Sequence, residues 1–251
     1  IVTAAATSGD GNYNGTNADD VTATNNDNDV AGVTVNQTSG LITTEAGGTA
    51  TFTVVLNTQP TADVTIALSS NITSEATVSP SGLTFTNGNW DSAQTVTVTG
   101  VNDDVDDGDI AYTIVTGDTV STDGNYSGLT VSDVTGTNTD DDTAGITVTP
   151  TSGLTTTEAG GTDTFTVVLD SEPTANVVIG VSSNDTSEGT VSPSTLTFTS
   201  GNWDSTQTVT LTGVDDALVD GNVAYTIVTA AATSGDGNYN GTNADDVTAT
   251  N

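Results

Sequence analysis

Apolar and polar residues alternate along most of this chain, which is the pattern of half-buried β-strands. The stretch TATFTVVL at residues 49–56, for example, places Phe52, Val54 and Leu56 on one face. Clusters of Gly, Asn, Asp and Pro separate such stretches, and no segment has a helical period. Within residues 30–142, strands are predicted near 33–43, 49–56, 63–69, 82–86, 94–100, 110–116 and 129–138. About seven short strands in a unit of this size are typical of an immunoglobulin-like antiparallel β-sandwich.

The chain repeats itself at two levels. The stretch TSGLITTEAGGTATFTVVL at 38–56 returns as TSGLTTTEAGGTDTFTVVL at 151–169, so that Glu45 corresponds to Glu158 and the period is 113. Between 38–116 and 151–229, 58 of 79 positions are identical. The stretch 1–25 also recurs unchanged as 227–251, which is a period of 226. The larger repeat is therefore a pair of slightly different units.

The shorter period has the length of a whole small domain rather than of a solenoid turn. We therefore expect residues 1–29 to be the C-terminal strands of a preceding repeat, 30–142 to be one β-sandwich and 143–251 a second. The prediction is an all-β array of such domains arranged end to end as a rod. Two strands alone are marginal in water, so we expect the array to extend beyond this window.

The composition excludes large classes of function. The 251 residues contain no Lys, Arg, His, Cys or Met and 33 acidic residues, for a formal net charge of −33. The chain therefore has no imidazole or amine side chain to act as a base and no thiol to act as a nucleophile, so we do not expect an enzyme. Nucleic acids and anionic membrane surfaces require cationic side chains, and no apolar run is long enough to span a bilayer. The partners that remain are cations.

The acids are concentrated at one predicted end of each sandwich. Because consecutive strands reverse direction, the loops near 45, 75 and 102–109 and the segment after 138 fall at the same end, and Glu75 and Glu188 are expected there too. The candidate metal ligands are Asp27, Asp29, Glu45, Asp103, Asp104, Asp107, Asp140, Asp142, Glu158, Asp215, Asp216 and Asp220. Carboxylates a few ångströms apart repel by roughly 1–4 kcal/mol per pair, so this convergence favours a bound cation.

Calcium fits these ligands best. It takes about 6–8 oxygen ligands in irregular geometry, whereas magnesium prefers fewer carboxylates and more water. Zinc and copper prefer His or Cys, which are absent. The loop NDDVDDGD at 102–109 has more acids than its counterpart DDALVDGN at 215–222, and Asp170 and Glu172 replace Asn57 and Gln59. We therefore expect the junction near 140–146 to bind more calcium, or to bind it more tightly.

Other polar and aromatic residues have simpler interpretations. The scattered acids Asp10, Asp19, Asp20, Asp123 and Asp133 are read as solvated surface. Trp90 and Trp203, in the repeated GNWD, are expected to pack against the sandwich or the neighbouring domain, and stacking on a sugar is the alternative.

Three stretches carry a family resemblance: TTEAGGTDTFTVVL at 156–169, LTFTSGNWDSTQTVTLTGVDD at 196–216 and NTDDDTAGI at 138–146. Together they resemble Calx-beta domains and the repeats of large bacterial calcium-dependent surface adhesins of the type I secreted, RTX type. The resemblance covers essentially the whole chain. It implies an immunoglobulin-like sandwich with calcium at one tip, bound by positions that match Glu45, Asp103, Asp107 and 140–142. Ala217, Leu218 and Val219 depart from that pattern in the second acidic loop.

These observations predict a structural repeat module of an extracellular fibre or giant cell-surface adhesin, stiffened by calcium at acidic junctions between domains. Its partners would be neighbouring repeats of the same array and, in a filament, identical chains. Two alternatives stay open. One is a self-assembling extracellular filament, surface-layer or biofilm matrix protein with lateral contacts between chains. The other is a carbohydrate-binding module, for which Trp90 is the main argument.

Overall fold

The computed structural model describes all 251 residues, which form nineteen β-strands and no helix. The chain is therefore all-β, as the alternating pattern predicts. In the first sandwich the strands are β1 (Val33–Asn36), β2 (Leu41–Thr44), β3 (Thr49–Leu56), β4 (Val64–Ser70), β5 (Ala76–Ser79), β6 (Gly82–Phe85), β7 (Gln94–Gly100), β8 (Ile110–Thr116) and β9 (Val134–Thr139). The structure contains no helix long and apolar enough to cross a membrane.

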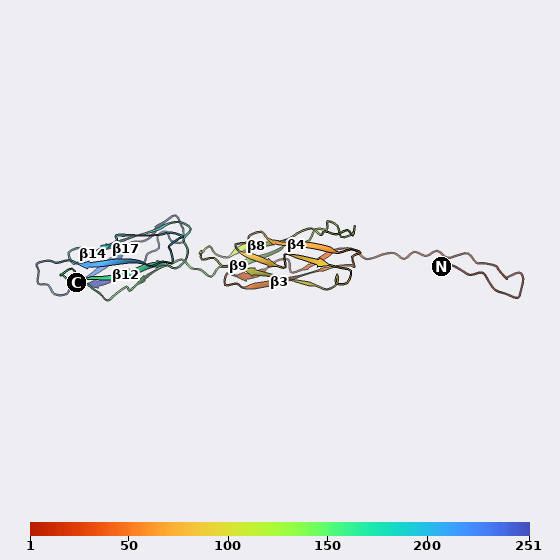
Figure 1. The fold of residues 1–251 in the computed structure, drawn as a ribbon, viewed down its shortest axis with the longest axis horizontal. Coiled ribbons are helices and arrows are strands. Elements are labelled where there is room, and N and C mark those ends of the chain that lie inside the picture. The colour runs from red at the N-terminus through yellow and green to blue at the C-terminus, as the bar shows by residue number, and fades with distance from the viewer.

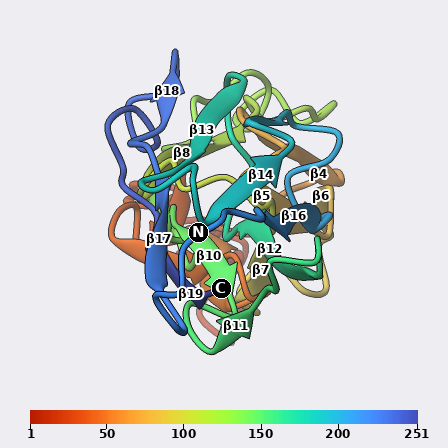
Figure 2. The same cartoon turned by 90° about the vertical axis from the view of Figure 1, so that its left-hand side faces the viewer.

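The second sandwich repeats this order, with one additional short strand. Its strands are β10 (Ile146–Thr149), β11 (Leu154–Thr155), β12 (Thr162–Leu169), β13 (Val177–Ser183), β14 (Gly189–Ser192), β15 (Thr195–Phe198), β16 (Gln207–Gly213), β17 (Ala224–Thr229), β18 (Thr233–Ser234) and β19 (Val247–Thr250). Figure 2 shows its two layers from the end, with β13, β17 and β19 in one layer and β12, β14 and β16 in the other.

The first sandwich is built from a four-stranded and a five-stranded sheet, and the second from a four-stranded and a six-stranded sheet, in which the additional short strand β18 pairs with β13. In the first, the order β1-β3-β7-β5 packs against β2-β9-β8-β4-β6. All pairs are antiparallel except β2 and β9, which are parallel, with Thr44 beside Thr139. In the second sandwich β11 and β19 form the equivalent parallel pair. This parallel pair matters for the site, because β2 and β9 leave the sheet at the same end.

The structure differs from the predicted strands in three places: 33–43 is divided, 129–138 is reduced to β9, and β5 was not predicted. The stretch 33–43 is divided into β1 and β2, which belong to different sheets, because the chain turns between them through Gln37 and Gly40, both at positive φ. The stretch 82–86 corresponds to β6, which pairs with β4, while the unpredicted β5 pairs with β7. Pro80 lies between β5 and β6, and proline has no N–H to continue a ladder.

Each sandwich encloses its own apolar core, made by the inward residues of the alternating strands. Phe52, Phe85 and Tyr112 are fully buried in the first, and Phe165 and Phe198 in the second. Burying a side chain of this size contributes about 1.5–3 kcal/mol. Trp90 and Trp203 are partly buried and pack against their respective cores, which confirms the packing interpretation of the two GNWD motifs.

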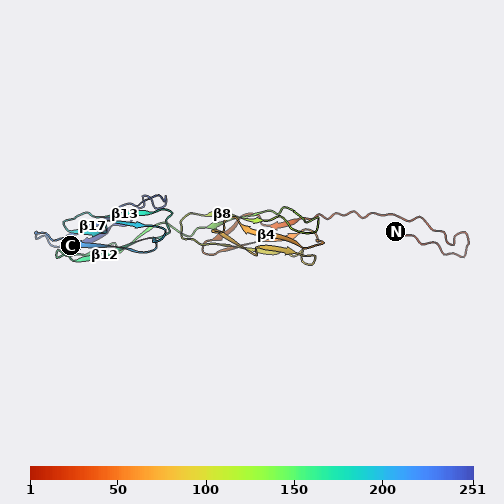
Figure 3. The same ribbon diagram turned by 45° about the horizontal axis from the view of Figure 1, so that its top comes forward.

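Residues 1–29 lie outside both cores. They contain no assigned strand and are exposed along almost their whole length. Figures 1 and 3 show this segment extending from the first sandwich, away from the second, and doubling back on itself. The chain therefore presents an extended N-terminal segment at one end and the second sandwich at the other.

Candidate metal centre

Four chain segments meet at the end of the first sandwich that faces the second. They follow β2, β4, β7 and β9, and they carry Glu45, Glu75, residues 103–107 and residues 140–142 respectively. The parallel register of β2 with β9 sets Thr44 beside Thr139, so Glu45 and Asp140, each the next residue, become neighbours. The backbone N–H of Glu45 donates to the Thr139 carbonyl at 3.1 Å, which ties the two segments together.

A close approach at Gly100 forms the base of this end. A Cβ at Gly100 would collide with the Thr44 carbonyl and with Oδ1 of Asn138, so glycine is required there. Asn138 is buried, accepts the Thr43 hydroxyl at 2.9 Å and donates to the Val101 carbonyl at 3.0 Å. The ends of β2, β7 and β9 are thus joined directly beneath the acids.

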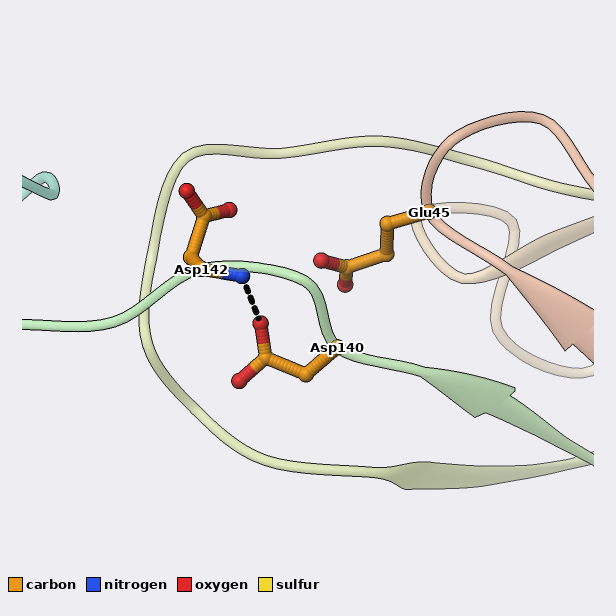
Figure 4. A group of neighbouring side chains, drawn as sticks. All are labelled: Glu45, Asp140 and Asp142. Atoms are coloured by element: carbon orange, nitrogen blue, oxygen red, sulfur yellow. Dashed lines mark hydrogen bonds between the residues drawn. The ribbon is translucent and has the colours of Figure 1, made fainter.

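Glu45, Asp140 and Asp142 form the first carboxylate group. One ligand oxygen from each lies within 4.8 Å of the others, and Figure 4 shows the three side chains around a common space. Glu45 is only 2% exposed, and its Oε2 has no hydrogen-bond partner. An unpartnered buried carboxylate oxygen is costly, so this position is built for a positive ligand.

Backbone N–H groups hold the aspartates of this group in place. Gly108 donates to Oδ2 of Asp140 at 2.7 Å, and Asp142 donates to Oδ1 of Asp140 at 2.8 Å, the bond drawn in Figure 4. The backbone N–H of Asp140 donates to Oδ1 of Asp109 at 3.2 Å. The segment after β9 is therefore fixed against the loop between β7 and β8.

A second group lies beside the first and consists of Glu75, Asp103 and Asp107. Glu75 is buried, and its Oε2 lies 3.5 Å from the donating Nδ2 of Asn138. Glu75 was expected at this end but not among the candidate ligands. Its place in a group with Asp103 and Asp107 became clear only from the structure, because the signal in sequence is a single acid in a short loop after β4.

Burial and mutual repulsion raise the pKa values of several carboxyl groups at this end. Burial, followed by the charges of Asp103 and Asp140, raises the pKa of Glu45 from 4.5 to about 7. Burial and neighbouring carboxylates also raise the pKa values of Asp107 and Asp142. Without a cation, several of these groups hold protons more strongly than free carboxyls do, because no Lys or Arg offsets their charge.

The second sandwich carries one such group, formed by Glu188, Asp216 and Asp220. These positions are the counterparts, one repeat further along the chain, of Glu75, Asp103 and Asp107 in the first sandwich. Glu158, the equivalent of buried Glu45, is exposed, yet its carboxyl pKa is raised by desolvation and by Asp216, Asp220 and Asp215.

Five of the candidate ligands lie outside every group, namely Asp27, Asp29, Asp104, Glu158 and Asp215. Asp215 is exposed and belongs to none of them. Asp27 and Asp29 are exposed in the N-terminal segment, where the backbone N–H of Asp29 donates to Oδ1 of Asp27 at 3.1 Å. Asp27, Asp29 and Asp215 therefore belong to none of the three-carboxylate groups.

Asp104 contributes its backbone to the junction between the sandwiches. The Asp104 carbonyl accepts the Glu172 N–H at 2.6 Å, and the Asp106 carbonyl accepts Nδ2 of Asn238 at 2.5 Å. Asp106 also accepts the Ala144 N–H at 2.8 Å through its carboxylate. The acidic loop of the first sandwich thus contacts the second sandwich directly.

The side chains of Asp170 and Glu172 add no carboxylate to these clusters. Asp170 accepts the Thr147 hydroxyl at 2.7 Å, and neither residue belongs to a three-acid group. In the loop at 102–109, Asp104 and Asp106 stand where the loop at 215–222 has Ala217 and Val219.

One interpretation from sequence was wrong. Asp123 is buried rather than solvated, and it accepts backbone N–H groups of Thr61 at 2.7 Å and Asn125 at 2.9 Å. These two N–H donors lower its carboxyl pKa. Asp236 makes the same contacts in the second sandwich, with Thr174 and Asn238. In each sandwich this acid joins two loops at the end opposite that sandwich's own carboxylate groups.

In chemical terms the acidic end offers only oxygen atoms as ligands. Two groups of three carboxylates lie side by side in the first sandwich and one group lies in the second. No imidazole, amine or thiol side chain is present to act as a base or nucleophile. The arrangement can bind hard cations and hold loops together through them.

Comparison with known proteins yields weak structural likenesses only. No family model matches the chain, and no curated protein matches it. Among solved structures, CBD12 from CALX1.2 is 18% identical, with a TM-score of 0.36 and 77% of each chain covered. The calcium binding domain CBD12 of CALX1.1 is 18% identical, with a TM-score of 0.37 and coverage of 77% of this chain and 78% of that one. Domains 4 and 5 of the S-layer protein SbsC are 17% identical, with a TM-score of 0.31 and coverage of 73% and 74%. Overlaps this small leave the function of the chain open.

Proposed function

We propose that the chain is a structural repeat module of an extracellular fibre or a large cell-surface adhesin, in which calcium binds at the acidic end of each sandwich and fixes it to the next. The observation that carries this proposal is the buried Oε2 of Glu45, which lacks a partner and faces Asp140 and Asp142. A bound divalent cation supplies the missing partner.

Calcium is the preferred ion for two reasons. The available ligands are carboxylate and backbone oxygens, and calcium accepts about 6–8 of these at about 2.3–2.6 Å without strict geometry. Magnesium requires near-octahedral geometry and keeps several waters, so a crowded set of carboxylates suits it less well. Calcium sites of extracellular modules bind at about 10⁻⁴–10⁻³ M, so such a module would be loaded outside cells and empty in the cytosol.

The position of the site supports a mechanical role. The loop that supplies Asp103 and Asp107 also supplies the carbonyls of Asp104 and Asp106 that accept hydrogen bonds from the second sandwich. An ion that orders this loop therefore also orders the junction. The absence of Lys and Arg leaves trypsin-like proteases no site to cleave, which suits an exposed fibre.

The test is small-angle scattering of the full chain in millimolar calcium and in excess chelator. We expect a longer maximum dimension and a narrower distribution of shapes in calcium. Glu45→Gln should reduce this difference, whereas Asp91→Asn, which removes an exposed charge outside the groups, should retain it. Identical scattering of the wild-type chain in calcium and in chelator would overturn the proposal.

A further inference from the structure

Tyr112 and Tyr225 are buried at equivalent positions of the two sandwiches, but their hydroxyl groups have different surroundings. The Tyr225 hydroxyl shares a hydrogen bond with the Thr156 hydroxyl at 3.1 Å. The Tyr112 hydroxyl has no hydrogen-bond partner, although Thr43 stands at the position of Thr156. Burial raises the pKa of Tyr112, and the nearby Thr43 hydroxyl lowers it in part without being placed to bond it.

Two small residues beside each tyrosine differ between the sandwiches in a reciprocal way. One lies in the tyrosine's own sheet and the other in the facing sheet. The pairs are Gly136 and Ala76 in the first sandwich, and Ala249 and Gly189 in the second. A Cβ at Gly136 would lie 2.6 Å from the tip of Tyr112, and a Cβ at Gly189 would lie 2.5 Å from the ring of Tyr225. Each tyrosine tip therefore rests against whichever of the two residues is glycine.

In the second sandwich the tyrosine ends a chain of hydrogen bonds that reaches a carboxylate group. The Thr156 hydroxyl donates to Oδ1 of Asn251 at 3.0 Å. Nδ2 of Asn251 donates to Oε2 of Glu188 at 3.4 Å and to the Val214 carbonyl at 3.1 Å. A hydroxyl carries one hydrogen, so the bond between Thr156 and Tyr225 takes its hydrogen from the tyrosine. Glu188 is buried and is one of the three carboxylates of this sandwich's group.

The first sandwich has the same chain without the tyrosine. The Thr43 hydroxyl donates to Oδ1 of Asn138 at 2.9 Å, and Nδ2 of Asn138 donates to the Val101 carbonyl at 3.0 Å and to Glu75 at 3.5 Å. The asparagine and the glutamate therefore have matching contacts in both sandwiches. The hydrogen bond from the tyrosine is the link that differs.

We propose that Tyr225 is a positioning residue for Glu188, acting through the hydrogen bonds between them, and that Gly189 is what admits its hydroxyl to this chain. A hydrogen donated by the tyrosine sets the direction of each later bond, so that the amide of Asn251 presents its N–H groups to the carboxylate. Tyr112, whose tip rests against Gly136 instead, only fills the core.

Residues that hold a metal ligand in place affect metal affinity without touching the ion. By this argument the tyrosine should strengthen cation binding in the second sandwich and leave it unaffected in the first. The effect on a cation rests on the proposed calcium function. The effect of the tyrosine hydroxyl on the fold does not, so the two are measured separately.

The first measurement is urea unfolding in chelator of Tyr225→Phe and Tyr112→Phe, which keep the ring and remove only the hydroxyl. Each sandwich has one tryptophan packed against its core, so a Trp90→Phe background reports the second sandwich and a Trp203→Phe background the first. Tyr225→Phe should lower the unfolding midpoint of its sandwich. Tyr112→Phe should leave the midpoint unchanged or raise it, because a buried hydroxyl without a partner is costly.

The second measurement is calcium affinity, which a role in packing alone would not change. With Glu45→Gln and Glu75→Gln disabling the groups of the first sandwich, a calorimetric titration of the full chain reports the group of Glu188. Tyr225→Phe should weaken this binding by up to about tenfold. In the matched control, which carries Glu188→Gln instead, Tyr112→Phe should leave calcium affinity unchanged.

An exchange of the two small residues tests the part played by glycine. Gly136→Ala alone should destabilise the first sandwich, because the new methyl group meets the tip of Tyr112. Adding Ala76→Gly should restore stability by opening the other side of the ring. In this double variant Tyr112→Phe should then lower the unfolding midpoint, as Tyr225→Phe does in the second sandwich.

Three results would each overturn the proposal: equal effects of the two phenylalanine substitutions on their own sandwiches, a calcium affinity that Tyr225→Phe leaves unchanged, or a double variant that is no more stable than Gly136→Ala. A wild-type chain that binds no calcium would overturn the proposed function. Unequal unfolding of the two phenylalanine variants would in that case still support the hydroxyl link to Glu188.

Discussion

Glu45 and Asp140 lie with carboxylate oxygens within 4.8 Å of each other because each directly follows one of two parallel strands, β2 and β9. The pairing of Thr44 with Thr139 places these acids at the same edge of the sheet. One of them is buried with an unpartnered oxygen. The strand register, rather than the local sequence, therefore creates the candidate site.

The metal-free protein should lose stability as pH rises. The pKa of Glu45 is about 7 in the folded chain against an ordinary 4.5, so the unfolded chain releases this proton more readily. The stabilisation that neutral Glu45 provides is complete below about pH 4.5 and is lost as pH rises through about 7. In chelator, we expect the unfolding temperature of the first sandwich to fall between about pH 5 and pH 8. The measurement is a series of thermal melts.

Calcium and Glu45→Gln are the controls for this pH dependence. Calcium favours the ionised carboxylate, so in its presence the fall with pH should disappear or reverse. Glu45→Gln should flatten the curve in chelator, although Asp107 and Asp142, whose pKa values are also raised, keep part of the slope. A wild-type unfolding temperature that rises with pH in chelator would contradict the assigned burial of Glu45.

Gly100→Ala should destabilise the first sandwich and weaken its cation binding. The added methyl collides with the Thr44 carbonyl and with Asn138, both of which hold the base of the acidic end. Overpacking of this kind costs about 1–3 kcal/mol. Gly124→Ala, where a Cβ meets nothing within 4 Å, is the matched control and should change stability little. Urea unfolding and calcium titration of both variants measure the two effects.

Asp236→Ala should destabilise the second sandwich, while Asp10→Ala should not measurably change unfolding. The two acids have identical neighbours in sequence, but only Asp236 accepts an N–H from a distant loop, that of Thr174 at 2.8 Å. Burial raises the pKa of Asp236, but the N–H donors Thr174 and Asn238 outweigh it and lower that pKa overall. Hydrogen bonds to charged groups contribute about 1.5–3 kcal/mol. Equal losses in the two variants would show that the loop contact is unimportant.

Most of the fold follows from the alternation of apolar and polar residues. Strands such as β3 and β7 have several alternating inward residues, so their sequences alone indicate their positions. The sequence did not reveal that residues 33–44 divide between two sheets, or that β5 forms a strand. Those elements are only four residues long, and their partners are determined by packing across the sandwich rather than by local pattern.

The sequence predicts which end of the sandwich carries the acids, but not which acids lie together in one group. Strand alternation places the acidic loops at one end, and the structure brings Glu45, Asp140 and Asp142 together there. Which acids share a group depends on loop paths that no local pattern specifies, as the inclusion of Glu75 and Glu188 shows. Asp123 was misread for the same reason, because its partner Thr61 lies in another loop.

The central claim is that calcium binds at the acidic end and stabilises the fold, and a thermal melt of the full chain in calcium and in chelator tests it most directly. At the affinity expected of an extracellular module, millimolar calcium is up to about 10 times its Kd and adds about 1.4 kcal/mol, and about 1 kcal/mol shifts the unfolding temperature of a domain this size by roughly 4–8 °C. We therefore predict a rise of roughly 5–10 °C in millimolar calcium for the wild-type chain, and a smaller one for Glu45→Gln. An unfolding temperature that is the same in calcium and in chelator would contradict the account.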